Sequence, residues 1–184
     1  MQKVNRNLPS KIVLTDFGGN YASFIDALYE VFRKDFIDDK TCFGSYKISL
    51  KFHPLFQGRA YTFYHITHKG EDEANRIPDL RRCECLPWAN PVIENTEKWK
   101  LRFWMQYRQK GIRICIWLDN EDDIDYFIIL DVRKTYILLW TSFVAEHSHE
   151  KNKKEKEYSQ WAKKNGDKIY TPDMLIEEIM KGLT

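Results

Sequence analysis

The sequence predicts an α+β fold, in which an N-terminal amphipathic helix packs on a mainly antiparallel sheet and further helices follow a C-terminal meander. Two observations lead to this prediction. Apolar residues recur at helical spacing between Tyr21 and Phe36, and short apolar runs rich in β-branched and aromatic residues follow one another between Ile112 and Val144. A sheet with helices on it is the simplest structure that satisfies both patterns.

The meander rests on three apolar runs, Ile112–Leu118, Tyr126–Val132 and Tyr136–Val144. Short polar breaks separate them, and such breaks predict antiparallel hairpins. A helix also fits runs this short, but their β-branched and aromatic content favours strands. Looser alternation over Trp99–Arg108 predicts a strand that pairs with the first run, and a helix capped at Thr96 is the alternative.

Three helices are expected outside the meander. Asn20 is a suitable N-cap for the amphipathic helix that runs to about Phe36. The lysine-rich segment Glu146–Lys168 is expected to form a solvated helix after the last strand. Thr171 as cap and Pro172 at the first helical position then begin the last helix.

The length of 184 residues suits one domain. We expect residues 1–46 to form its helical N-terminal part, residues 47–144 the sheet-forming core and residues 145–184 the C-terminal helices. A net charge of +2 gives no global basic signature, so a nucleic-acid partner requires a local basic patch. The polar first ten residues and the lack of a membrane-spanning apolar run predict a cytoplasmic protein without a membrane partner and with reduced cysteines.

Two strands are expected before the meander. Lys47–His53 alternates strictly between polar and apolar residues, and Tyr61–His68 is expected to be its partner. In such a strand, Tyr64 and Ile66 are the better core-facing pair. His65 is then expected on the more open side.

The segment Glu71–Glu94 contains three prolines and no clean period. We expect a long packed loop with a turn of helix near Asp79–Cys83, and loops of this kind are often functional. Arg81 and Arg82 lie in it close to Trp88, where they could clamp a phosphate and stack a base. Surface ion pairs with the neighbouring acidic residues explain the same arginines equally well.

Ligand-type side chains occur at His65, His68, Cys83 and Cys85. Zinc binds such sets, but residues three apart on a strand point to opposite faces. Buried thiols in a core are therefore the favoured interpretation.

Asp125 and Asp131 faintly resemble the strand carboxylates of magnesium-dependent nucleases. Those enzymes need a carboxylate and a lysine two residues apart, and here Arg133 holds the place of the lysine while Lys134 is out of phase. Asp131 precedes a hairpin, where aspartate is common. We expect no metal and no cofactor, and no glycine-rich phosphate loop is present in the sequence.

Several segments resemble phage-type members of the barnase–EndoU–colicin–RelE ribonuclease superfamily. One is the aromatic–His–hydrophobic–Thr segment that enters their nuclease domain, another is the loop that leads to their sheet, and the third is their terminal meander, with a lysine-rich helix behind it. The resemblance covers about Lys47 to Tyr158 and is carried by Phe63–Thr67, Arg81–Glu84, Trp88, Pro91, Ile93, Glu94 and Ile112–Val144.

The resemblance implies metal-independent cleavage of RNA, in which the 2′-hydroxyl attacks the adjacent phosphate and leaves a 2′,3′-cyclic product. This chemistry needs a base, an acid and a cation. Carried onto this sequence, His65 is the acid/base candidate, Arg82 the phosphate clamp and Thr141 the hydroxyl that orients the phosphate. The substrate-binding candidates are Arg81, Trp88, Ser142 and His147, of which His147 could act as a second acid/base if the chain curls back.

Parity along the strands supports a common site. Ile137, Leu139 and Thr141 share one face of the last strand, which we expect to point inward. Only Thr141, the last of the three, is polar. If the sheet twists, His65, Arg82 and Thr141 can face one concavity. A single catalytic set needs its side-chain tips within roughly 10 Å of a common point.

The leading functional hypothesis is therefore a bacterial or phage-derived, toxin-like RNA endonuclease with RNA as its substrate and a cognate inhibitor protein as a further partner. The alternative is a non-catalytic RNA- or protein-binding module of phage or mobile-element origin. A metal-dependent nuclease that uses Asp125 and Asp131 is a third hypothesis.

Overall fold

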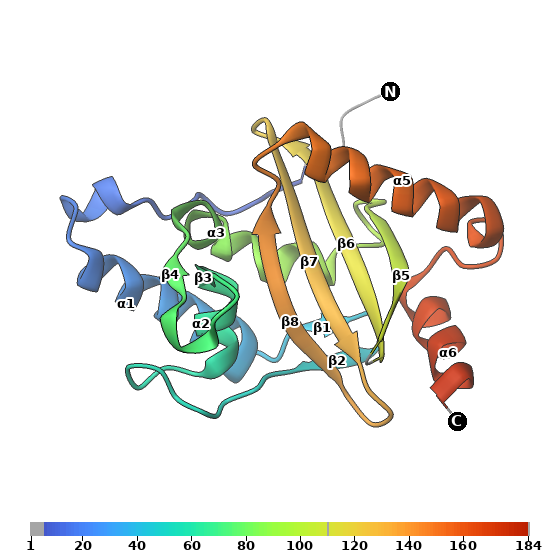
Figure 1. Cartoon of the computed structure of the whole chain (residues 1–184), viewed down its shortest axis with the longest axis horizontal. Coiled ribbons are helices and arrows are strands. Elements are labelled where there is room, and N and C mark those ends of the chain that lie inside the picture. Colours follow the sequence, from blue (N-terminus) through green and yellow to red (C-terminus); the bar gives the residue numbers. More distant parts are fainter. Residues whose placement is uncertain (1–5, 110, 184) are drawn as a thin grey trace.

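The computed structural model describes residues 6–109 and 111–183, and it confirms the α+β prediction. The main sheet has six strands in the order β1-β2-β8-β7-β6-β5, and β3 and β4 form a separate two-stranded ribbon (Figure 1). Neighbouring strands of the main sheet are antiparallel except β2 and β8, which are parallel. The strands are β1 Cys42–Phe43, β2 Tyr46–Ser49, β3 His68–Lys69, β4 Ile77–Pro78, β5 Arg102–Arg108, β6 Gly111–Glu121, β7 Ile124–Val132 and β8 Ile137–Val144.

The predicted meander is confirmed as β6, β7 and β8, and the strand expected over Trp99–Arg108 is β5. One irregularity interrupts the pairing of β7 with β8. Ile129 pairs with Thr141 and Leu130 pairs with Leu139, so Trp140 is an extra residue in β8. This is a β-bulge, which bends a strand and changes the direction of its side chains.

The predicted helices are also present. α1 spans Tyr21–Phe32 and continues as a π-helix, η2, over Arg33–Asp38. The Asn20 side chain accepts a hydrogen bond of 3.1 Å from the Ser23 amide, as expected of an N-cap. α5 spans Ser148–Asn165, and α6 spans Pro172–Leu183. None of the helices in the described ranges combines the length and the apolar character needed to cross a membrane.

The strand predicted over Tyr61–His68 is wrong, because Tyr61–Thr67 forms the helix α2. The same residues also satisfy helical spacing, since Phe63 and Ile66 are three apart and both are buried in the core. The preceding strand is shorter than predicted and pairs with β8 instead, so α2 packs beside β8 where a partner strand was expected. Tertiary packing here overrides the local β-propensity.

The segment predicted as a long loop contains several short helices, although its turn of helix near Asp79–Cys83 is confirmed as α3. Asp79 caps this helix by accepting a hydrogen bond of 3.3 Å from the Arg82 amide. Prolines in the segment begin or interrupt turns and conceal any helical period. The helices after β4 are α3 Leu80–Glu84, the 3-10 helix η4 Leu86–Trp88 and α4 Ala89–Glu94, and two further 3-10 helices are η1 Leu14–Phe17 and η3 Glu73–Asn75.

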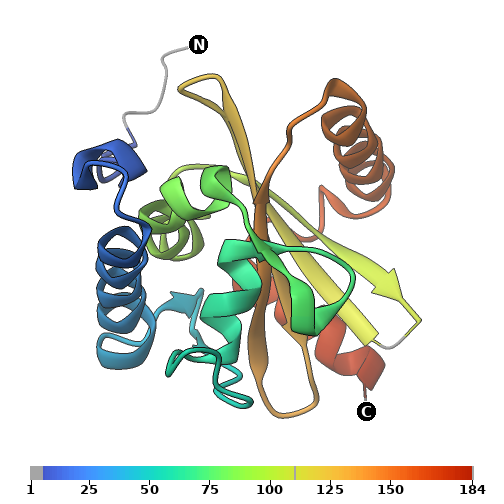
Figure 2. The same ribbon diagram turned by 60° about the vertical axis from the view of Figure 1, so that its left-hand side comes forward.

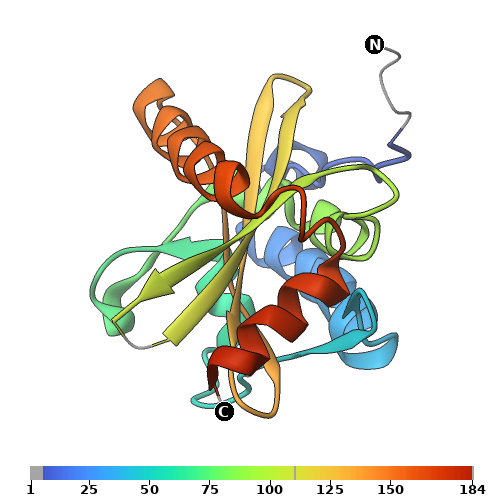
Figure 3. The ribbon, with the colours of Figure 1, turned by 90° about the vertical axis from the view of Figure 1, so that its right-hand side faces the viewer.

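Helices cover the two faces of the main sheet unequally. Figure 2 shows α1 and α5 on opposite sides of it, and Figure 3 shows α5 and α6 at the end of the sheet formed by β5. The larger core lies on the face covered by α1, α4 and α6, where Phe24, Val92 and Ile176 are fully buried with Leu130 and Leu139. Most of the apolar burial that stabilises the fold is therefore on this first face.

A smaller core lies on the second face, under α5. Trp104, Trp117 and Phe127 are buried there, and Tyr158 and Trp161 of α5 pack against them. Farther along the same face, Arg113 of β6 and Asp131 of β7 are paired across the strands and place charged side chains there.

Candidate functional site

His65 lies on α2 at the edge of β8, and its closest polar contact is an arginine. Arg76 Nη2 is 3.0 Å from His65 Nε2, and Glu73 Oε1 is 3.7 Å from the same nitrogen. A guanidinium has only donors, so Nε2 is the acceptor and the imidazole is neutral with its proton on Nδ1. His65 is 6% exposed, which means that Arg76 and the surrounding chain cover it.

A second arginine lies beside the first. Arg76 Nη1 and Arg82 Nη1 both donate to the backbone carbonyl of His68, at 3.3 and 3.4 Å. Two neighbouring guanidiniums repel each other, and Asp79 offsets part of this by pairing with Arg82 Nε at 3.2 Å. Burial lowers the pKa of Arg82, the Asp79 carboxylate opposes that change, and the charge of Arg76 adds to it. The pair is therefore a concentrated, partly desolvated positive charge next to His65.

Glu73 is the carboxylate of this cluster. Its Oε1 lies 3.4 Å from Arg76 Nη2, and its other oxygen accepts a hydrogen bond from the hydroxyl of Tyr61 on α2. Partial burial acts to raise the pKa of Glu73, but the Tyr61 hydroxyl and the charge of Arg76 outweigh it and hold the pKa below its usual value. Glu73 is thus ionised at neutral pH, and half of its side-chain surface is exposed.

The environment of His65 keeps its ring neutral. Its pKa is lowered to about 4, first by burial and then by the charge of Arg76, although Glu73 acts to raise it. His68, at the end of α2, also has a pKa lowered to about 4, mainly by burial. Near pH 7, Arg76 and Arg82 therefore carry the positive charge of the cluster, and both imidazoles are neutral.

The bulge in β8 turns Trp140 toward His65. The two rings are 5.2 Å apart between centroids, and Arg113 of β6 lies over the same indole at 4.6 Å. Thr141, next in the chain, pairs with Ile129, whose side chain packs on the second face. The expectation that Thr141 extends the inward set of Ile137 and Leu139 is therefore wrong, because the extra residue reverses the parity.

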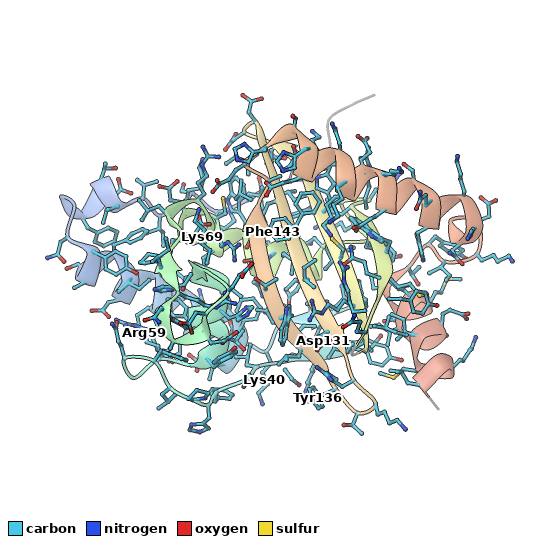
Figure 4. The ribbon with its side chains drawn as sticks, viewed as in Figure 1. Lys40, Arg59, Lys69, Asp131, Tyr136 and Phe143 are labelled. Carbon is cyan, nitrogen blue, oxygen red and sulfur yellow. The ribbon has the colours of Figure 1, made fainter. Side chains whose placement is uncertain are left out.

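Thr141 follows Trp140 but makes no hydrogen bond with His65 among the described residues, and its hydroxyl donates to the Ser142 carbonyl at 3.5 Å. The part of the second face that α5 does not cover continues from Thr141 across the neighbouring strands. Figure 4 labels Phe143 near α5 and Asp131 toward the other end of the strands. Asp131 is 2% exposed and pairs with Arg133 at 2.5 Å and with Arg113 at 4.0 Å. Arg113 therefore links a buried carboxylate to the Trp140 ring.

Arg82 thus shares the His68 carbonyl with Arg76, the direct partner of His65, whereas the four binding candidates lie elsewhere. Trp88 is 2% exposed and donates from Nε1 to the Pro9 carbonyl at 2.8 Å, so no base can stack on it. Ser142 is 1% exposed and lies opposite Ile128 on the first face. Arg81 points to solvent from α3, and His147 is the N-cap of α5, stacked on the ring of His149.

The carboxylates and thiols considered as metal ligands in the sequence have other partners. Asp125 accepts a hydrogen bond of 2.9 Å from Trp117 Nε1 and pairs with Lys151. Cys83 donates to the Thr67 carbonyl at 3.4 Å. Within residues 6–109 and 111–183, no three histidine, cysteine, aspartate or glutamate side chains are grouped closely enough to hold a metal ion.

Sequence reasoning missed Glu73, Arg76 as a direct partner of His65, and the role of Trp140. Glu73 and Arg76 are three residues apart in an irregular segment, where no periodicity indicates what they contact. A helical assignment of α2 would have placed Tyr61 and His65 on one face, and this was the available signal. The bulge at Trp140 has no sequence signature here.

We compared the chain with models of known protein families, with curated proteins and with solved structures, and none of these comparisons gave a significant match. Any function must therefore be argued from the site itself.

Proposed function

We propose that the protein is a metal-independent RNA endonuclease that forms 2′,3′-cyclic phosphate ends, with its site at His65, Glu73, Arg76 and Arg82. The observation that carries the proposal is the convergence of two partly buried arginines, one imidazole and one carboxylate at the edge of β8. The resemblance of the chain to phage-type members of the barnase–EndoU–colicin–RelE superfamily supports the same reaction.

The arginines are suited to hold the phosphate that reacts. In the structure, their Nη1 atoms share the His68 carbonyl as their acceptor. Arg76 also donates one hydrogen bond to the neutral imidazole of His65. A phosphate offers charged oxygen acceptors, and such hydrogen bonds are roughly twice as strong as neutral ones. RNA binding would move Arg76 from His65 to the phosphate, where its charge stabilises the pentacoordinate transition state.

Glu73 and His65 supply the two proton transfers. Glu73 is ionised and half exposed, which is the state required of the base that takes the 2′-hydroxyl proton. Burial and the charge of Arg76 both lower the pKa of His65. Movement of Arg76 to the phosphate would uncover the ring and neutralise that charge, and the phosphate anion would raise the pKa further. His65 can then be protonated and act as the acid.

The proposed cleavage requires no cofactor, because each bond that forms is matched by one that breaks. The 2′-oxygen forms a bond to phosphorus as its proton passes to Glu73, and the bond from phosphorus to the 5′-oxygen breaks as that oxygen receives the proton of His65. The hydroxyl of Thr141 would orient the phosphate, because Thr141 follows Trp140 in β8 and the Trp140 ring contacts His65. Toxin-like activity and a cognate inhibitor protein remain part of the same proposal.

One observation favours a second function, that of a non-catalytic RNA- or protein-binding module. His65 is 6% exposed and Arg76 occupies its Nε2, so the imidazole is not accessible to a substrate in this conformation. In a binding module, the arginines would hold RNA phosphates while His65 served only to pack against Trp140.

The experiment incubates purified protein with structured and unstructured RNA in EDTA and follows cleavage. Cleavage by the wild-type protein, with a loss of at least 100-fold in rate for His65→Ala and for Glu73→Gln, is the expected result, since general acid–base catalysis contributes about 10²–10⁴-fold. His53→Ala and Glu71→Gln are matched controls at exposed positions and should retain the rate. RNA binding without cleavage would favour the binding module.

A further inference from the structure

A cavity of about 340 Å³ lies beside the proposed catalytic cluster. It is enclosed by α1, α2, the turn Phe56–Arg59 and the segment from Ala74 to Pro78. Its floor is apolar, with Ile25 and Phe63 buried, and its rim is exposed. Ligand pockets in proteins begin at about 300 Å³, so this cavity suits a ligand of the size of one nucleoside.

Aromatic rings form one wall of the cavity. Phe56 and Tyr64 are stacked at 4.1 Å with planes 7° apart, and Tyr64 contacts the His68 ring at 4.5 Å. Tyr64 and His68 are four residues apart, which places them on one side of α2 at the helix end. Phe56 is held by a tight turn in which its amide and carbonyl both bond to Arg59, at 3.0 and 2.9 Å. A preformed stack of this kind can be extended by a planar ring.

The charge of the cavity is positive. Arg59 and Arg76 line it, and none of the described residues that line it is acidic. Arg59 pairs with Asp26 at 2.5 Å, and Asp26 is not itself a lining residue. Tyr21 adds a phenol whose hydroxyl is buried without a hydrogen-bond partner among the described residues, which is uncommon for a polar group in a native protein. The cavity thus offers an aromatic wall, two arginines and the Tyr21 hydroxyl. This combination favours an electron-rich planar ligand with an attached anion.

Arg76 connects the cavity with the catalytic cluster. Its side chain lines the cavity, while its Nη2 contacts His65 Nε2. His65 and Tyr64 are adjacent in α2 and therefore point to neighbouring sides of the helix. A phosphate held by Arg76 would thus be within one nucleotide of a base in the cavity.

We propose that this cavity binds the base of an unpaired RNA nucleotide adjacent to the scissile phosphate, so that the substrate is single-stranded RNA. The inference rests on the proposed function, because it takes the Arg76 phosphate as its starting point. A base that enters the cavity stacks on the Phe56 and Tyr64 wall and cannot remain paired. Base–aromatic stacking tolerates all four bases, so the preference is for strandedness and not for one sequence.

The test uses a fluorescein-labelled RNA oligonucleotide of mixed sequence in which every ribose carries a 2′-O-methyl group. This probe has no free 2′-hydroxyl and cannot be cleaved by the proposed route. Fluorescence anisotropy measures its binding as a single strand and after annealing to its complement. We expect the wild-type protein to bind the single strand on the order of ten-fold more tightly than the duplex, because stacking of one base contributes about that factor or more.

Two variants address the cavity and one serves as control. Phe56→Ala removes part of the stack, and Ala74→Trp fills the cavity from an exposed rim position, which keeps the test valid if Phe56→Ala does not fold. Each should weaken single-strand binding about ten-fold and abolish the preference over duplex. Tyr107→Ala, at an aromatic residue that is 76% exposed on β5 and does not line the cavity, should bind as the wild type does.

Equal binding of single strand and duplex by the wild type, or unchanged binding by both folded cavity variants, would overturn the inference. Cleavage assays on unmodified RNA separate this failure from failure of the proposed function. If the cavity variants still cleave RNA with the strand preference of the wild type, the base site is refuted and the catalytic proposal stands. Cavity-dependent binding by a protein that never cleaves RNA refutes the catalytic proposal and leaves the base site standing.

Discussion

Arg76 Nη2 lies 3.0 Å from His65 Nε2, and this contact acts together with burial to keep the imidazole neutral. A guanidinium cannot accept a hydrogen bond, so the imidazole must be neutral for the contact to exist. The same arginine lines the neighbouring cavity and donates to the His68 carbonyl. One side chain therefore couples the charge, the accessibility and the proposed substrate contacts of the site.

Arg76→Ala should raise the pKa of His65 from its low value. The variant removes the positive charge and also exposes the ring to solvent, and both changes favour the imidazolium. NMR titration of the histidine ring protons measures the shift. Arg81→Ala, at an exposed arginine on α3, is the control and should leave the titration unchanged. An unchanged pKa in Arg76→Ala would show that the contact does not persist in solution.

Stability should depend on pH through His65 and His68, the two histidines of α2 and its C-terminal end. Their folded pKa of about 4 lies below the unfolded value of about 6.5, so between these values the unfolded chain binds more protons and the free energy of unfolding falls as the pH falls. Each histidine contributes at most roughly 3 kcal/mol over this range. Urea unfolding at pH 7 and pH 5 should show a smaller loss in His65→Gln than in the wild type. The exposed His53→Gln should behave as the wild type, and equal losses in all three proteins would contradict the assignment.

Thiol labelling should distinguish Cys42 from the other cysteines. Cys83, Cys85 and Cys115 are at most 1% exposed, and burial raises the pKa of the Cys83 and Cys85 thiols to about 12. Cys42 is partly exposed at the start of β1. A thiol-specific reagent at pH 8 should label one site rapidly in the folded protein and four sites after denaturation. Rapid labelling of Cys83 or Cys85 would contradict the packing of α3.

Trp88→Ala should lower the free energy of unfolding by about 3–5 kcal/mol, because it opens a cavity in the main core and removes the bond to the Pro9 carbonyl. Tyr107→Ala, at a highly exposed aromatic residue, should change it by less than about 1 kcal/mol. Denaturant unfolding measures both. A loss of RNA binding in Trp88→Ala with unchanged stability would restore the substrate-stacking role that its burial argues against.

The sequence was most informative where one pattern dominated. The runs from Ile112 to Val144 are bounded by strong breaks and appear as β6, β7 and β8, and Asn20 and Pro172 mark helix starts through their own local chemistry. The strand prediction for Tyr61–Thr67 was wrong because its aromatic residues satisfy both the strand and the helix pattern. Packing against β8 decides between the two.

The site was less predictable than the fold. His65 and Arg82 were identified from the sequence as candidate site residues. Their proximity, however, depends on α2 being a helix and on the cap that Asp79 provides for α3. The position of Thr141 depends on the extra residue at Trp140, which shifts the register by one and cannot be inferred from alternation. Glu73 is fixed by Tyr61 across a turn of irregular chain, a contact that no periodicity encodes.

In the proposed reaction, the 2′-hydroxyl of the substrate attacks the phosphate held by Arg76 and Arg82. Analysis of the cleaved ends by mass spectrometry in EDTA tests it most directly, with a second substrate that carries a single 2′-deoxy residue at the mapped cleavage position. We expect 2′,3′-cyclic phosphate ends on the unmodified RNA and no cleavage at the deoxy position. Ends with a 3′-hydroxyl, or cleavage that continues at the deoxy position, would contradict it.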